Sequence, residues 1–161
     1  MELPVINHPD YVAKINDDNK FPIKKFGALA KYLLEKDVVK KFHIPKECSF
    51  ETLKTSHSIE YINHIKNKTL DIKAQKRIGF PINDSVVKRS FVATGGTVLA
   101  SKLALDSKLA CNTAGGSHHA TFDFGAGYCV FNDVAVAANY LKNKGYAKKI
   151  LIFDLDVHQG N

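Results

Sequence analysis

The sequence predicts an α/β fold with a mainly parallel central sheet. Two segments with strand character, 109–113 and 150–157, flank a stretch with helical spacing at 132–141. A strand, a helix and a second strand in this order form a βαβ unit with a right-handed crossover. The second segment starts with continuous apolar residues, several of them β-branched, which is typical of a parallel strand buried on both faces.

The helix of this unit has recognisable ends. Asn132 or Asp133 can cap its first turn, and Gly145 can end it. Two shorter helices are expected earlier in the chain. One begins at Pro22, with apolar residues at 23, 26, 29 and 33 on one face, and the other spans residues 57–66. Residues 70–81 have a mixed composition and are expected to form a loop.

A longer helix is predicted after residue 82, where Asn83, Asp84 or Ser85 can cap it. Its centre contains Gly95 and Gly96. Two glycines in a helix interior cost about 2 kcal/mol relative to alanine. A helix tolerates this cost where another backbone passes close, so we expect tight packing at this pair.

The bulk properties are those of one ordinary globular domain of 161 residues. The sequence has no apolar stretch long enough to span a membrane, and its N-terminus lacks a secretion signal pattern. Three widely spaced cysteines suit a reduced cytoplasm better than a disulfide framework. The net charge of +7 indicates either a solvated lysine-rich surface or a face for an acidic partner, and no nucleic-acid motif accompanies it.

Candidate metal ligands gather at the end of the last predicted strand. Because side chains alternate along a strand, Asp154, Asp156 and His158 should share one face. Neighbouring carboxylates need a cation or a histidine to offset their charge. A carboxylate and an imidazole two residues apart suit a divalent metal, with zinc the leading candidate. The alternative is a strand that simply becomes polar where it leaves the core.

Two adjacent histidines, His118 and His119, follow the first predicted strand in a glycine-rich turn. Histidine titrates near neutral pH and is suited to proton transfer. Carboxyl ends of parallel strands lie at one edge of a sheet, so this turn should lie near the acidic strand end. Asp154 would be free to orient one histidine if Asp156 and His158 hold the metal. The alternative is a pair of ordinary surface histidines.

Three motifs occur in the second half of the chain: Gly-Gly-Ser-His-His at 115–119, Gly-Ala-Gly-Tyr-Cys-Val-Phe-Asn-Asp at 125–133, and Asp-Leu-Asp-Val-His-Gln-Gly-Asn at 154–161. In order and spacing they resemble the histone deacetylase superfamily, and the last one is most similar to bacterial and class IV members. Weaker similarity extends upstream to residues 57–62 and 77–81.

This resemblance implies an arginase/deacetylase-like three-layer fold and a role for each matching residue. His119 matches the general base, His118 its neighbour, and Asp154 the carboxylate that orients His118. Asp156 and His158 match two zinc ligands, and Gly127 and Tyr128 match the channel around the acyl-lysine chain. Asp154 also matches a residue of the family's structural potassium site.

The resemblance also shows departures. The family's third zinc ligand, an aspartate, and its oxyanion-stabilising tyrosine would lie beyond Asn161, so residues 1–161 are expected to be the N-terminal portion of one deacetylase domain whose sheet is incomplete. Lys20 stands where many bacterial members have an arginine associated with an inner exit channel. Asn161 occupies a position where some members have aspartate, which is a mild change.

The implied activity is zinc-dependent hydrolysis of an acetyl or other acyl amide on lysine or a related amine such as a polyamine. Two alternatives stay open: a truncated homologue that is inactive or only binds, and an arginase-like manganese ureohydrolase. An interior strand left at the edge of an incomplete sheet would also expose unpaired backbone groups. We therefore expect the chain to self-associate through that edge.

Overall fold

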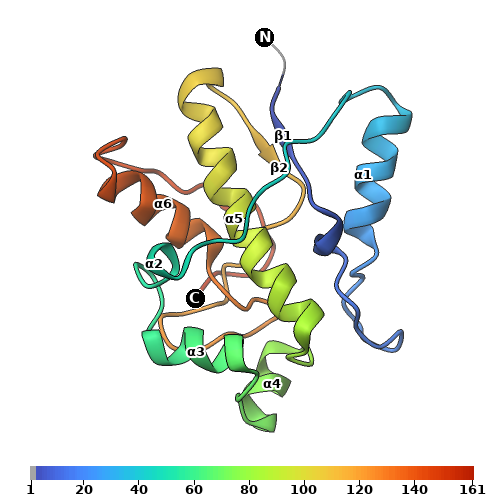
Figure 1. Cartoon of the computed structure of the whole chain (residues 1–161), viewed down its shortest axis with the longest axis vertical. Coiled ribbons are helices and arrows are strands. Elements are labelled where there is room, and N and C mark those ends of the chain that lie inside the picture. The colour runs from blue at the N-terminus through green and yellow to red at the C-terminus, as the bar shows by residue number, and fades with distance from the viewer. Residues whose placement is uncertain (1–2) are drawn as a thin grey trace.

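The computed structural model describes residues 3–161, and it is mainly helical with a small parallel sheet (Figure 1). Strand β1 pairs with β2 in parallel, with Val5 opposite Cys111 and Ile6 opposite Asn112. The elements in chain order are β1 (Val5–Ile6), the 3-10 turn η1 (Pro9–Tyr11), α1 (Lys25–Glu35), α2 (Phe50–Leu53), α3 (Ile59–Asn67), α4 (Ile72–Ile78), α5 (Asp84–Ser107), β2 (Cys111–Asn112) and α6 (Asp133–Asn143).

The long helix α5 runs through the middle of the molecule, with α6 on one side and α1 on the other (Figure 1). Val92 of α5 and Val136 of α6 are buried, and Phe131, which precedes α6, packs edge-on against Phe91 of α5. The apolar core therefore lies around α5. It supports the loops that connect β2 to α6.

The tight packing predicted at the glycine pair of α5 is confirmed. A Cβ atom at Gly95 would overlap the backbone carbonyl oxygen of Lys46, and one at Gly96 would overlap the hydroxyl of Tyr11. The amide of Cys48 also donates to the carbonyl of Phe91 at 2.9 Å, so this passing backbone is bonded to the helix. Only glycine allows the two segments to approach this closely.

Two helix caps occur at predicted places, and a third lies within a helix whose cap was not predicted. Asn83 caps α5, Asn132 caps α6, and Ser58 caps α3 within the helix expected at 57–66; each side-chain oxygen accepts a backbone N–H of the first turn. Helix α1 begins at Lys25, three residues after the Pro22 start expected from the sequence.

The expectation of a loop at 70–81 was wrong for most of that segment. Helix α4 spans Ile72–Ile78, with Asp71 as its N-cap and Gly79 in the left-handed conformation at its C-terminal end. Ile78 is fully buried against the core. A cap at each end and one buried anchor stabilise a helix of two turns that has little apolar periodicity.

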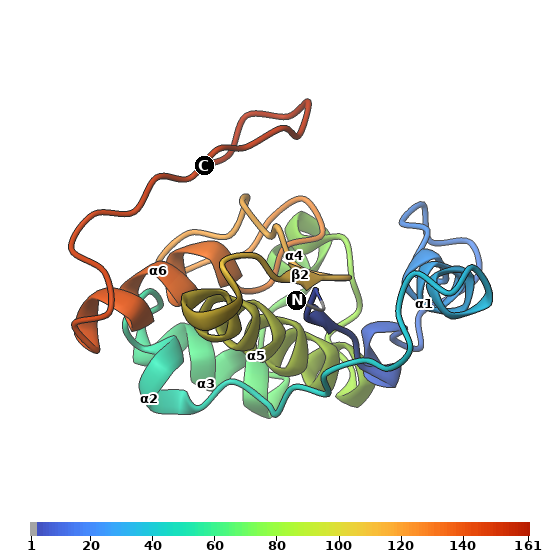
Figure 2. The same ribbon diagram turned by 90° about the horizontal axis from the view of Figure 1, so that it is seen from above.

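The prediction of a strand at 150–157, buried on both faces, was also wrong. This segment has no strand pairing and extends along one side of the helical body (Figure 2). Leu151, Phe153 and Val157 are 88%, 78% and 91% exposed. A central parallel strand needs backbone partners on both edges, and the paired strands of residues 3–161 are short and lie elsewhere.

Within residues 3–161, no helix combines the length and the apolar character that crossing a membrane would require.

Candidate active site

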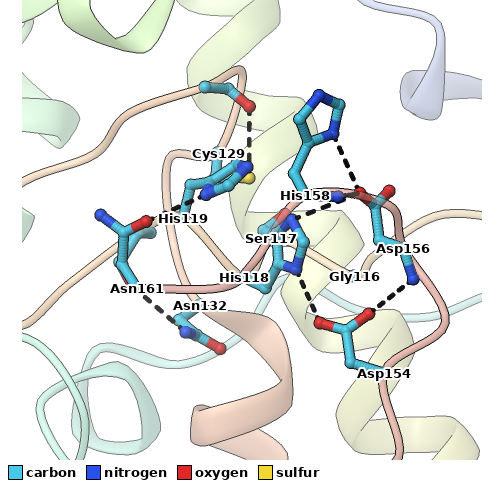
Figure 3. A network of polar contacts seen from close by, with 12 residues as sticks. Gly116, Ser117, His118, His119, Cys129, Asn132, Asp154, Asp156, His158 and Asn161 are labelled. Atoms are coloured by element: carbon cyan, nitrogen blue, oxygen red, sulfur yellow. Dashed lines mark hydrogen bonds and ion pairs between the residues drawn. The ribbon is translucent and has the colours of Figure 1, made fainter.

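The glycine-rich turn before α6 brings the two predicted histidines together. Gly115 and Gly116 adopt φ angles of 112° and 73°, a conformation that favours glycine. The turn they form places the rings of His118 and His119 with centroids 4.2 Å apart (Figure 3). The turn therefore presents two imidazoles side by side.

Asp154 contacts the first histidine as the sequence predicted. One carboxylate oxygen lies 2.7 Å from Nδ1 of His118, and the other accepts the backbone N–H of Asp156 at 2.9 Å (Figure 3). These two contacts, the backbone N–H first and His118 second, lower the pKa of Asp154. Asp154 is thus held as a carboxylate against the His118 ring.

Asp156 and His158 lie beside this pair. Oδ1 of Asp156 is 3.0 Å from Nδ1 of His158 and 4.0 Å from Nε2 of His118. The backbone N–H of His158 also donates to Asp156 at 2.8 Å, and this bond followed by the His158 ring lowers the pKa of Asp156. Asp154 and Asp156 thus lie beside His118, and His158 lies beside Asp156, although the strand that was to align the three residues does not form.

His119 has a different partner. Its Nδ1 lies 3.0 Å from Oδ1 of Asn161, whose backbone N–H donates to the carbonyl oxygen of His118 at 3.0 Å (Figure 3). Because an amide oxygen only accepts, Nδ1 of His119 carries the proton. The other nitrogen, Nε2, is then free to accept a proton from a reacting group.

A cavity of about 420 Å³ adjoins these groups and includes both predicted channel residues. Gly127 lies against the His119 ring, where a Cβ atom would approach Cδ2 within 2.7 Å. The Tyr128 ring packs 5.0 Å from Phe21 and 5.3 Å from Phe80. The lining consists of Phe21, Lys25, Phe26, Arg89, Gly115, Gly116, Ser117, His118, His119, Gly127, Tyr128, Cys129, Asp156 and His158.

Arg89 is a cavity residue that the sequence reasoning did not identify. Its guanidinium lies over the rings of Phe26 and Phe80, and its Nε donates to the carbonyl of Tyr11 at 3.0 Å. Burial lowers its pKa to about 10, while the charge of Asp133 opposes this shift. An arginine within the apolar part of α5 was a signal that could have found it.

Asp133 was also overlooked, because its position suggested only a helix cap. The actual cap is Asn132, while Asp133 is 1% exposed and bonds to the backbone of the histidine turn. Because Asn132 already caps the helix, a buried aspartate beside it indicates that its carboxylate bonds to a group outside the helix.

The sequence profile of the histone deacetylase domain matches residues 20–161, which is most of the chain. The chain belongs to the histone deacetylase family. The resemblance inferred from the three motifs is therefore confirmed.

Similarity to individual relatives covers nearly the whole chain. A protein of Picosynechococcus sp. is 44% identical over 163 residues, which cover 100% of this chain and 54% of the relative. Histone deacetylase 2 of Arabidopsis thaliana is 29% identical and is matched over 88% of this chain and 38% of its own length. The chain thus spans about half the length, or less, of these relatives.

A solved structure confirms the fold class. The crystal structure of a histone deacetylase homologue complexed with SAHA superimposes with a TM-score of 0.75 at 25% identity, covering 91% of this chain and 42% of that one. The mixed helices and small parallel sheet are thus part of an α/β deacetylase fold.

Proposed function

We propose that this chain supplies the N-terminal part of the catalytic domain of a zinc-dependent deacylase. The substrate would be an acetyl or other acyl amide on lysine, or on a related amine such as a polyamine. The observation that carries the proposal is that His118, His119, Asp156 and His158 line one cavity. Membership of the histone deacetylase family supports amide hydrolysis as the reaction class.

Asp156 and His158 fit a zinc site by the chemistry of their donors, because zinc binds carboxylate oxygen and imidazole nitrogen. Residues 3–161 contain no cluster of three such groups placed to hold a metal ion. A catalytic zinc site uses three protein ligands. We therefore infer that a third ligand comes from outside the described residues. As a separate part of the proposal, a structural potassium ion would bind near Asp154.

Zinc, when bound, supplies a Lewis acid that polarises an amide carbonyl and acidifies water. The chain's own residues handle the protons. His119, with Nδ1 bonded to Asn161, takes the proton of the attacking water at Nε2 and delivers it to the departing amine. Asp154 holds the His118 ring beside it. Gly127 and Tyr128 form one wall of the channel for the acyl-bearing chain.

The proposal is tested on the full-length gene product that contains these residues. Purified protein should contain about one zinc per chain and hydrolyse an acetyl-lysine peptide or an acetylated polyamine. Asp156→Ala and His158→Ala should both lose zinc and activity, since each removes one of three ligands.

Matched controls are Asp106→Ala and His64→Ala, which change an exposed aspartate in α5 and a partly exposed histidine in α3. Both should keep zinc and activity. Hydrolysis that persists without zinc, or zinc content unchanged in the two ligand variants, would reject the proposed site.

One observation favours a second candidate, a homologue that binds acylated amines without hydrolysing them. The described residues alone do not complete a metal site. Such a protein would bind the acyl peptide with no turnover at any zinc concentration. An arginase-like ureohydrolase would instead require manganese and hydrolyse a guanidinium compound, so the same assay with manganese and arginine separates it.

The three cysteines are unpaired, which supports a cytoplasmic location as part of the proposal.

A further inference from the structure

We propose that Asp133 is a positioning residue that holds the turn carrying His118 and His119 in its reactive geometry. This role rests on the proposed function, since it acts through the two histidines. Asp133 itself contacts the backbone of the turn and not the reacting groups.

The carboxylate of Asp133 binds two successive backbone N–H groups of the turn. Its Oδ1 accepts from Ser117 at 2.8 Å, and its Oδ2 accepts from Gly116 at 3.1 Å. Ser117 immediately precedes His118. The two bonds therefore fix the two successive peptide planes that lead into Ser117 and His118.

The same carboxylate is itself held from the other side. The hydroxyl of Thr97, in α5, donates to Oδ2 of Asp133 and accepts from the side-chain amide of Asn112 at 3.1 Å. The hydroxyl of Tyr11 donates to the Asn112 oxygen at 2.9 Å. A continuous series of side-chain hydrogen bonds thus ties the turn to η1, α5 and β2.

Close packing supports the same conclusion. A Cβ atom at Gly115 would come within 2.5 Å of Oδ2 of Asp133 and 2.8 Å of the Thr97 hydroxyl. The turn therefore lies directly on the carboxylate, and its φ of 112° at Gly115 also favours glycine.

A carboxylate is the group that this place requires. An ionised aspartate only accepts hydrogen bonds, so it can bind two N–H groups and one hydroxyl together. Asparagine has the same shape, but its NH₂ group would face one of those donors. The negative charge is also favoured at the start of α6, where the helix dipole is positive. Asp133→Asn should therefore release one side of the turn without leaving a cavity.

Loss of this contact should lower the catalytic rate constant more than it weakens substrate binding. Displacing a catalytic group by about 1 Å can lower a rate about 100-fold. In the full-length protein, Asp133→Asn should lower kcat roughly 10- to 100-fold and change KM less than about threefold. Zinc content should stay the same, because Asp156 and His158 lie on a different segment.

A threonine pair on α5 separates positioning from general stability. Thr97→Val removes one donor to Asp133, whereas Thr94→Val removes a buried hydroxyl that bonds within the helix to Ser90. Thr97→Val should lower kcat several-fold, Thr97→Ser should retain it, and Thr94→Val should leave it unchanged. Equal kcat values in the two valine variants, or wild-type kcat in Asp133→Asn, would overturn the proposal.

Amide hydrogen exchange tests the contact independently of the reaction. The N–H groups of Gly116 and Ser117 should be protected in the wild type and exchange at least tenfold faster in Asp133→Asn. A wild type that hydrolyses no substrate while showing this difference would reject the proposed function and keep the structural contact. Unchanged exchange in the variant would reject the role of Asp133 itself.

Discussion

His118 and His119 are neighbours in the chain, yet their rings bond to different kinds of partner. His118 faces the carboxylate of Asp154, and His119 faces the neutral amide of Asn161. The carboxylate orients the His118 ring, whereas the amide oxygen, which only accepts, fixes the His119 tautomer with its proton on Nδ1. The tautomer with Nε2 unprotonated supports the proposed role of His119 in proton transfer.

Removing the proposed base should slow the reaction without removing the metal. We expect His119→Ala to lower kcat roughly 10²- to 10⁴-fold, because general acid–base catalysis contributes about that much. Steady-state kinetics together with zinc analysis would measure both effects. Asn161→Ala is the matched comparison, and its loss should be smaller because the base remains. Near-normal kcat in His119→Ala would show that another group takes the proton.

Among the helices, α5 depends on two residues that weaken it locally. Gly95→Ala should destabilise the protein even though alanine favours a helix by about 1 kcal/mol over glycine. The added methyl group would overlap the carbonyl oxygen of Lys46, which belongs to a backbone that cannot rotate away. Thermal unfolding should show a lower Tm.

Gly27→Ala in α1 is the control for this substitution. There the nearest atom is a methyl group of Val12 at 3.1 Å, which can move by rotation. Its Tm should equal or exceed that of the wild type. A higher Tm for Gly95→Ala would mean that the close approach of the two backbones is not required.

The start of α6 is joined to the segment that precedes α3 through a buried histidine, His57. Nε2 of His57 accepts the backbone N–H of Asn132 at 2.9 Å, and its Nδ1 has no hydrogen-bond partner within residues 3–161. Burial lowers the pKa of His57, partly opposed by the backbone groups of Thr121 and Phe122. The folded protein thus keeps this ring neutral under conditions in which the unfolded chain protonates it.

This pKa difference predicts a pH-dependent stability. At pH above about 6.5, the ring is neutral in both states and the contribution of His57 is fully present. As the pH falls below that value, the unfolded state binds the proton first, so the free energy of unfolding decreases. His57→Gln keeps an acceptor near Asn132 and should reduce this decrease between about pH 6.5 and 5. Denaturant titrations at several pH values would measure the free energy of unfolding. His64→Gln should show the same decrease with falling pH as the wild type.

The molecule as a whole has an uncovered apolar segment at its C-terminal side. Leu151, Phe153 and Leu155 are largely exposed on a backbone without strand pairing. Such a segment invites pairing with another chain. The 161-residue chain expressed alone should therefore self-associate in a concentration-dependent way, which sedimentation velocity would detect.

Polar substitutions identify the surface responsible. Leu151→Ser with Phe153→Ser should shift the population toward monomer, whereas Ile72→Ser, at an apolar position of α4 that is also largely exposed, should not. A wild-type chain that stays monomeric at all concentrations would show that this segment does not associate.

The sequence alone was sufficient for features that depend on local chemistry. The caps at Asn83 and Asn132, the glycine pair of α5 and the tandem histidines of the turn were all predicted, because each depends on a few adjacent residues. The contact between Asp154 and His118 was also predicted, from the family pattern.

Only the tertiary structure decided features that depend on distant partners. Residues 150–157 have strand character in their sequence, but a strand forms only where other strands satisfy its N–H and C=O groups. Helix α4 is stabilised by burial of Ile78, which its short and polar sequence does not indicate. Asp133 bonds to the backbone of Gly116, and Arg89 bonds to the backbone of Tyr11. Long-range packing brings these partners together, and the spacing of residues in the sequence does not predict these contacts.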